Sequence, residues 1–105
     1  MRIDPGELSK RIEILKGYSE SKDGYPVEKA ETIRRCWARV THESGSEVMK
    51  QDTLVAKSKV RFLVRKTATE VTTDMYIMYA GKRHDIVYIR DYDDPYSEII
   101  TERNE

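Results

Sequence analysis

The chain has 105 residues, of which 38% are hydrophobic and 36% are charged, and its 19 basic and 19 acidic side chains give a formal net charge of zero. This length predicts a single domain over residues 1–105, and zero net charge excludes a field of one sign that would draw the whole protein to nucleic acid or an anionic membrane. With one cysteine and no apolar run approaching the roughly 20 residues of a membrane span, the sequence excludes a disulfide-stapled scaffold and predicts a soluble protein made in a reducing cytoplasm.

The first predicted strand covers residues 11–18. Apolar and polar side chains alternate there, which places Ile12 and Ile14 on one face. The polar segment 19–26 follows, and its Asp23-Gly24 pair is typical of a hairpin turn because both residues tolerate positive φ. A return strand is therefore expected after this turn.

Residues 33–42 supply the return strand. Small apolar side chains occupy every second position at Cys36, Ala38 and Val40, so this face is expected to point inward. The opposite face, predicted to point outward, carries Arg35, Trp37, Arg39 and Thr41.

Residues 43–58 fit no regular period. Their apolar positions match neither a helix stripe nor strand alternation, so the segment is predicted to be a long, mobile or partly helical loop between the second and third strands. Connections of that length in a small domain are usually functional or disordered.

Four further strands are predicted in the second half of the chain, and Gly81 supplies the turn of a hairpin. The alternation of apolar and polar residues places these strands at Val60–Arg65, Met75–Ala80, Lys82–Asp91 and Ser97–Glu102. Six short strands joined by turns indicate a mainly β fold, a small antiparallel barrel or sandwich.

Catalytic, cofactor and metal sites are not predicted. Gly81-Lys82 lacks the earlier glycine and the following Ser or Thr of a phosphate-binding loop. The acidic turn after Asp91 has Pro95 and Tyr96 where a calcium loop needs a ligand and a glycine. A solvated turn is the expected structure in both places.

The two histidines and the cysteine are also given structural roles. His42 and His84 are expected at strand ends, because with one cysteine they cannot form a credible zinc site. Cys36 lies on the predicted core face, where a thiol is usually a small hydrophobe with a raised pKa.

Arginines gather around Trp37 and Phe62, which raises two kinds of binding surface. Small barrels bind single-stranded nucleic acid through aromatic residues in basic grooves, but interleaved carboxylates weaken the phosphate attraction on which such binding depends. Trp and Arg are also common anchors of protein interfaces. We therefore predict a subunit interface that includes Arg35, Trp37 and Arg39.

Taken in order, these blocks resemble the head-tail joining proteins of long-tailed bacteriophages, also called head completion or stopper proteins. The resemblance covers nearly the whole chain. It rests on Leu8, Arg11-Ile12-Glu13-Ile14, Cys36-Trp37-Ala38-Arg39-Val40, Val60-Arg61-Phe62-Leu63-Val64-Arg65, Met75-Tyr76-Ile77, Gly81-Lys82 and Asp85-Ile86.

The resemblance implies a virion protein with no cofactor and no enzymatic activity, made in the cytoplasm of a bacterial host. In that family a ring of about twelve copies joins the portal and adaptor, completes the head and provides the attachment surface for tail proteins. The loop between the second and third strands projects into the channel, close to packaged DNA, and helps to retain it. The matching channel-loop candidates in this chain are Glu43, Glu47, Lys50, Gln51 and Asp52.

Two alternatives stay open at this point. A barrel that acts alone would bind single-stranded nucleic acid tightly and in a salt-sensitive way. A tail-side protein similar to a tail terminator would have other ring partners.

Overall fold

The computed structural model describes the backbone of residues 5–50, 53–92 and 95–104, and the side chains of these residues except 5, 44–50, 53–57 and 104. It contains one short 3-10 helix, η1, and six strands. Their bounds are η1 Pro5–Glu7, β1 Lys10–Lys22, β2 Tyr25–Lys50, β3 Thr53–Arg65, β4 Met75–Tyr79, β5 Lys82–Asp91 and β6 Tyr96–Asn104.

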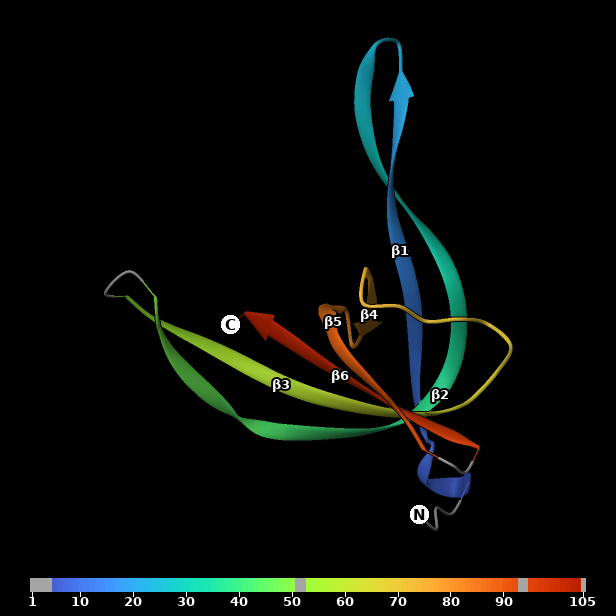
Figure 1. Cartoon of the computed structure of the whole chain (residues 1–105), viewed down its shortest axis with the longest axis vertical. Coiled ribbons are helices and arrows are strands. Elements are labelled where there is room, and N and C mark those ends of the chain that lie inside the picture. Colours follow the sequence, from blue (N-terminus) through green and yellow to red (C-terminus); the bar gives the residue numbers. More distant parts are fainter. Residues whose placement is uncertain (1–4, 51–52, 93–94, 105) are drawn as a thin grey trace.

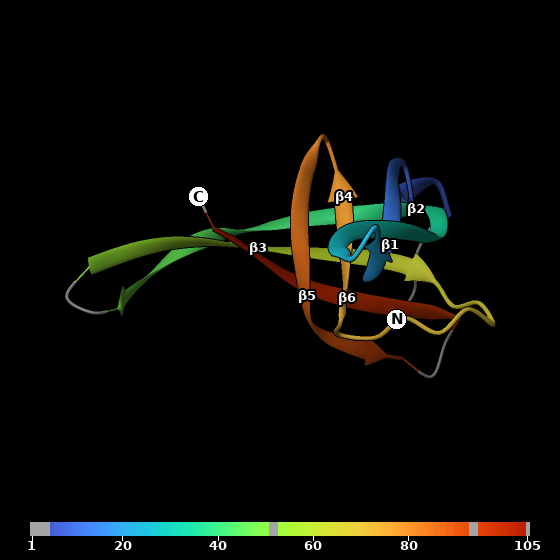
Figure 2. The same ribbon diagram turned by 90° about the horizontal axis from the view of Figure 1, so that it is seen from above.

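The six strands close into an antiparallel barrel in the order β1-β2-β3-β6-β5-β4 (Figures 1 and 2). Closure depends on the pairing of β1 with β4, which joins residues 13–16 to residues 75–78. The predicted mainly β fold of six antiparallel strands is confirmed. In this closed order every strand has a neighbour on both sides, so the wall contains no edge strand.

The inward faces of all six strands form one core. Phe62 is fully buried, and its ring forms T-shaped contacts with the rings of Tyr79 and His84 at centroid distances of 5.7 and 5.4 Å. The buried hydroxyl of Thr101 donates a hydrogen bond of 2.8 Å to the carbonyl oxygen of Val60. The apolar members of the core cluster are Ile12, Ile14, Cys36, Ala38, Val60, Phe62, Val64, Met75, Ile77, Ile86 and Ile99.

Both predicted glycine turns are confirmed. Asp23 and Gly24 have φ of 54° and 81°, and Ala80 and Gly81 have φ of 53° and 75°. Positive φ at both central residues is the geometry of the two-residue type I′ turn, whose twist matches that of the flanking strands.

His84 lies near the start of β5, as expected of a strand-end histidine, but its burial was not predicted. It is 2% exposed and faces the core. The reason is the strand period: His84 and Ile86 are two residues apart on β5 and therefore share the inward face.

The first hairpin is longer than the sequence predicted. Residues 19–26, expected to be a polar turn region, are paired strand up to the Asp23-Gly24 turn. We call residues 17–32 the β1–β2 arm, because they extend beyond the barrel wall (Figure 1).

The segment 43–58 is the second correction. No helix occurs among its described residues. The backbones of β2 and β3 instead pair in register from Ser46 with Lys57 to Lys50 with Thr53, after an irregularity that follows Glu43. A β-hairpin satisfies the backbone hydrogen bonds that a long open loop would leave to solvent. These paired residues, the β2–β3 arm, leave the barrel in a different direction from the β1–β2 arm (Figure 1).

The two arms give the molecule an open outline. Its radius of gyration is 15.6 Å and its principal extents are 50 × 38 × 23 Å, whereas a compact domain of this length has a radius of gyration of about 13 Å. Much of the chain therefore lies outside the barrel, where it can be covered only by another molecule.

Candidate assembly surfaces

The predicted interface residues lie together on the outer wall of the barrel, on β2. Trp37 is 52% exposed and points away from the core, as its position between Cys36 and Ala38 requires. The guanidinium of Arg11, from the neighbouring strand β1, lies 5.3 Å from the centre of the Trp37 ring. The large indole is thus held in place but not covered.

Arg35 and Arg39 flank Trp37, and each has one carboxylate partner. Arg35 Nε lies 3.4 Å from Glu13 Oε1, and Arg39 Nη1 donates a hydrogen bond of 3.0 Å to Glu7 Oε2. Ion pairs this exposed contribute about 0–1 kcal/mol each. They orient the arginines weakly, so the guanidinium groups remain free to contact a partner.

Beside Trp37 the surface is hollowed into a cavity of about 300 Å³ that we call the arginine groove. Four arginines from three strands line it, together with an exposed aromatic ring and two apolar side chains. Its lining residues are Leu8, Arg11, Arg34, Arg35, Cys36, Trp37 and Arg65.

A β-bulge in β2 lies next to the arginine groove. The register of β1 with β2 shifts between Ile14 and Leu15, which pair with Arg34 and Thr32 and leave Ile33 without a partner residue. A bulge of this kind increases the local twist of the strand. The next two residues, Arg34 and Arg35, both line the groove.

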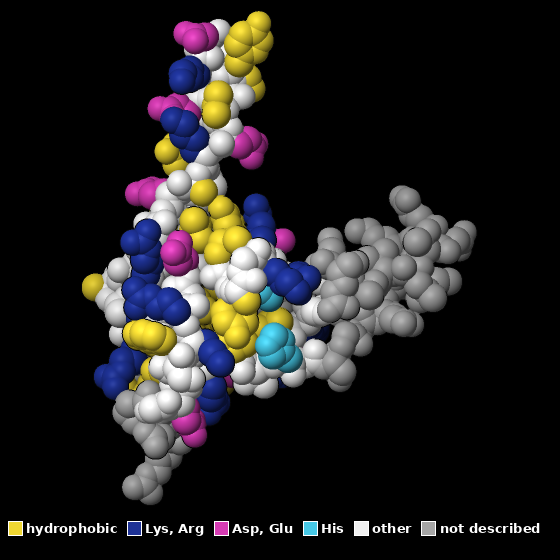
Figure 3. Space-filling model, turned by 180° about the vertical axis from the view of Figure 1, so that it is seen from behind, with side chains coloured by type: hydrophobic (Ala, Val, Ile, Leu, Met, Phe, Trp, Pro, Cys, Tyr) yellow, Lys and Arg dark blue, Asp and Glu magenta, His cyan; other side chains and the backbone are white. Residues whose placement is uncertain are grey.

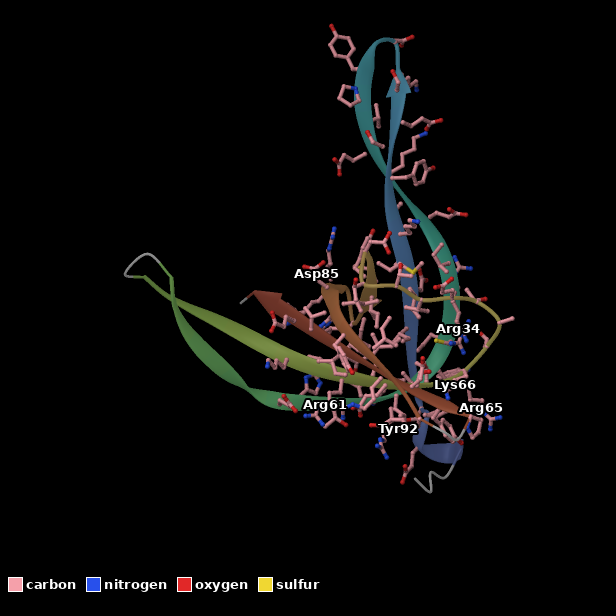
Figure 4. The ribbon with its side chains drawn as sticks, viewed as in Figure 1. Arg34, Arg61, Arg65, Lys66, Asp85 and Tyr92 are labelled. Carbon is pink, nitrogen blue, oxygen red and sulfur yellow. The ribbon has the colours of Figure 1, made fainter. Side chains whose placement is uncertain are left out.

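A larger cavity of about 490 Å³ adjoins the groove, since Arg34 and Arg65 line both. The connection between β3 and β4 forms one side of it, and the ends of β5 and β6 form the other. Lys66, directly after β3, is bonded to the segment between β5 and β6. Its backbone N–H donates a hydrogen bond of 2.8 Å to the carbonyl of Pro95, and its ammonium group donates one to the carbonyl of Tyr92. Figure 4 shows Arg34, Arg65 and Lys66 on one side of the barrel.

The β1–β2 arm has two different faces, which follow from its register. Tyr18 lies opposite Lys29 and Glu20 opposite Val27, so this face mixes apolar and charged side chains. Tyr25, at the tip, is 74% exposed and the arm projects well clear of the barrel in the space-filling view (Figure 3).

The other face of the β1–β2 arm carries small side chains and a single charge. Gly17 lies opposite Ala30, and Ser19 lies opposite Glu28. Among the described residues, no cation forms an ion pair with Glu28, whereas Glu20 lies 2.6 Å from the ammonium of Lys29. A flat, small-residue face can approach another surface closely.

The channel-loop candidates are distributed along the β2–β3 arm. Glu43 lies at its base and forms an ion pair with Arg61. The backbones of Glu47 and Lys50 belong to paired strand, while Gln51 and Asp52 lie outside the described residues. Their role in a channel stays a prediction.

Cys36 and His84 carry the most reactive side chains of the core, and both are buried. Burial raises the pKa of the Cys36 thiol above its ordinary value, against the opposing charges of Arg34 and Arg11. Burial is also the main reason that the pKa of His84 lies below its ordinary value. Both groups are therefore favoured in their neutral forms.

Other charges around His84 act in the same direction. Arg103, His42 and Lys82 lower its pKa further, and Asp85 opposes them. Its Nδ1 is buried without a hydrogen-bond partner in the described structure. A proton on this ring would add a charge to the core with little to stabilise it.

Over the described ranges, no group of three or more His, Cys, Asp or Glu side chains could hold a metal ion. Asp91, which precedes the acidic turn, accepts a hydrogen bond of 2.5 Å from the hydroxyl of Ser97. In the same part of the chain, no helix is long and apolar enough to cross a membrane.

Part of this surface is predictable from the sequence. The sequence pattern places Arg35, Trp37 and Arg39 on the outward face, and the structure confirms that placement. The pattern does not bring Arg11 and Arg65 into the same groove, because they come from other strands. The side-by-side order of β1, β2 and β3 brings these residues together, and the lateral order of strands has no clear signal in the sequence.

Comparison with known proteins gives a structural likeness and a sequence family. The barrel superimposes on a chain from the virion of a native gene transfer agent particle with a TM-score of 0.70 and 16% sequence identity, covering 92% of this chain and 94% of that one. No curated protein is detectably similar in sequence. The model of the phage head completion protein family matches residues 3–102, and the chain therefore belongs to the phage head completion proteins, structural components of the virion.

Proposed function

We propose that this protein docks as a ring of about twelve copies under the portal and adaptor, completes the head and provides the surface to which the tail attaches. It would do so by surface contacts, without bond chemistry. Family membership over residues 3–102 supports a structural role in the phage head. The assembly into a ring is supported by the open outline of the molecule, in which two arms project from a closed barrel.

A projecting hairpin is costly to maintain alone. An isolated two-stranded hairpin is marginally stable in water because it has no second layer to cover it. In a ring, neighbouring copies would supply that layer. Each copy would contact its neighbours through its own arms and through the surface around Trp37. The arms are thus better explained by assembly than by a protein that acts alone.

The β2–β3 arm is the proposed DNA-retaining element. From Ser46 to Lys50 its paired backbone extends by up to about 14 Å at 3.4 Å per residue. Within a ring, arms of this length directed at the axis would narrow the channel. Withdrawal of the arms would reopen it for DNA ejection.

Electron microscopy and native mass spectrometry of the protein mixed with its cognate portal and adaptor complex test the ring. We expect a ring added below the adaptor, with a mass that gives the copy number. Absence of binding would refute the proposal, and tight single-stranded DNA binding by the monomer in its place would favour a lone nucleic-acid module.

A deletion of residues 44–56 tests the retaining arm separately. We expect a folded barrel, since the pairing of β2 with β3 from Arg39 with Leu63 to Glu43 with Lys59 lies outside that range, and particles that assemble but lose their DNA. Circular dichroism and thermal unfolding provide the folding control. Normal DNA retention by the deletion variant would refute the retaining role and leave the ring intact.

A further inference from the structure

The arginine groove holds an unbalanced positive charge. Four arginines are among the seven residues that line a cavity of about 300 Å³, although the chain as a whole has zero net charge. Among the described residues, neither Arg34 nor Arg65 forms an ion pair, and Arg35 alone of the four has a carboxylate partner, Glu13. Like charges gathered in this way repel one another unless an anion lies between them.

The shape and residue types of the groove favour a carboxylate on a protein surface. Arginine presents a planar set of donors that matches a carboxylate, and it stacks on aromatic rings as Arg11 does on Trp37. A duplex or a single strand would need a longer basic track than this one cavity, with neutralisation of several phosphates. A projecting acidic side chain beside a small, flat face would fit the groove and the neighbouring indole.

The β1–β2 arm of the same chain has that complementary character. Residues 17–32 contain four acidic side chains and two lysines. On the small-residue face, between Gly17, Ser19 and Ala30, Glu28 is the one charged residue and is unpaired within the described structure. The space-filling view shows acidic side chains along the arm with lysines between them, and further Lys and Arg side chains at its foot (Figure 3).

One copy cannot bring these two surfaces together. Glu28 and Arg34 are six residues apart on the extended strand β2, a separation of about 20 Å at 3.4 Å per residue. The arm points away from the barrel side that carries Arg34 and Arg65 (Figure 4). Two complementary patches at different places on one chain produce a head-to-tail contact, which closes into a ring when the rotation between copies permits.

We propose that the arginine groove receives Glu28 from the β1–β2 arm of a second copy of this chain, with the small-residue face of that arm packed over Trp37. The inference rests on the proposed function, because it names the contact between neighbouring copies in the ring. It assigns Arg34 and Arg65 as binding residues and explains why the arm is acidic and uncovered.

A charge swap tests the pairing on full-length protein mixed with its portal and adaptor complex. The variants are R65E, E28R and the double variant R65E/E28R, with R83E as the matched control, because Arg83 is an exposed arginine that is already paired with Asp85 within its own chain. Native mass spectrometry and sedimentation velocity measure ring assembly. Circular dichroism verifies the fold of each variant.

We expect each single reversal to weaken assembly by about tenfold or more, the double variant to recover to within about threefold of wild type, and R83E to assemble normally. Normal rings from R65E or from E28R would overturn the inference and leave the proposed function standing. Loss in both single variants without recovery in the double would overturn Glu28 as the occupant. Failure of the wild type to join the complex would overturn the proposed function and, with it, this inference.

Discussion

The strands β1 and β2 run through two contrasting environments. In the barrel they bury Ile12, Ile14, Cys36 and Ala38, each at most 8% exposed, whereas no residue between 16 and 32 is buried. The same pair of strands thus supplies the core at one end and an uncovered ribbon at the other. Stability in this protein resides in the barrel, and the arm is available for contact with another molecule.

The largest expected effect lies at the centre of the barrel. Phe62→Ala would remove a fully buried ring that packs against Tyr79 and His84, and truncations of this kind cost about 3–5 kcal/mol. Urea unfolding should show a loss of that size. A loss below about 1 kcal/mol would contradict the assignment of stability to the barrel.

Acid should weaken the barrel through His84. Its pKa in the folded protein lies below the ordinary value of 6.5 because the ring is buried, so the unfolded chain binds the proton more readily. The contribution of this group to stability is complete above pH 6.5 and is lost as the pH falls through the folded pKa.

The variant His84→Phe tests this pH dependence. Phenylalanine keeps a ring against Phe62 and cannot be protonated, so the fall in unfolding free energy between pH 7 and pH 5 should become shallower than in wild type. Denaturant unfolding at the two pH values measures it. An equal fall in both proteins would exclude His84 as the source.

Gly81→Ala should have a smaller effect, confined to the backbone. A Cβ at this position would meet no atom within 4 Å, but the φ of 75° is unfavourable for residues other than glycine. We expect a loss of about 1 kcal/mol. Gly17→Ala is the control on the arm, where φ is not positive, and its effect on thermal unfolding should be smaller.

The smallest effect on stability is expected from the arm itself. Tyr18→Ser and Tyr25→Ser change side chains that are 46% and 74% exposed, and such substitutions usually stay within about 0.5 kcal/mol. The free protein should unfold at the wild-type midpoint in both cases. A loss of 2 kcal/mol or more would show that the arm stabilises the isolated chain, and it would contradict the assignment of stability to the barrel alone.

The same contrast explains what the sequence could and could not predict. Alternation of apolar and polar residues arises where one face of a strand is buried, and residues 11–18 and 33–42 were correctly predicted on that basis. Where a strand leaves the barrel, neither face needs to be apolar. Residues 19–26 and 43–58 therefore show no regular alternation of apolar and polar side chains. The arms were therefore predicted as turn or loop although their backbones are paired.

The candidate surface was predictable only in part, for a related reason. The outward direction of Trp37 follows from alternation within one strand. The arginine groove depends on the approach of Arg11 from β1 and of Arg65 from β3, which is a property of the closed barrel. His84 was expected at a strand end because a zinc site was not credible, and its spacing of two residues from Ile86 was not used, although that spacing indicates the inward face.

Hydrogen exchange of the free and the assembled protein tests the central claim, that the barrel is complete alone while the β1–β2 arm is completed by a neighbour. In the free protein, amides of the paired barrel residues, such as Ile12 and Ala38, should exchange slowly and those between residues 18 and 30 quickly. In the ring bound to the portal and adaptor complex, the arm amides should become protected and the barrel amides should change little. Arm amides that are as well protected in the free protein, or that stay unprotected in the ring, would contradict this account.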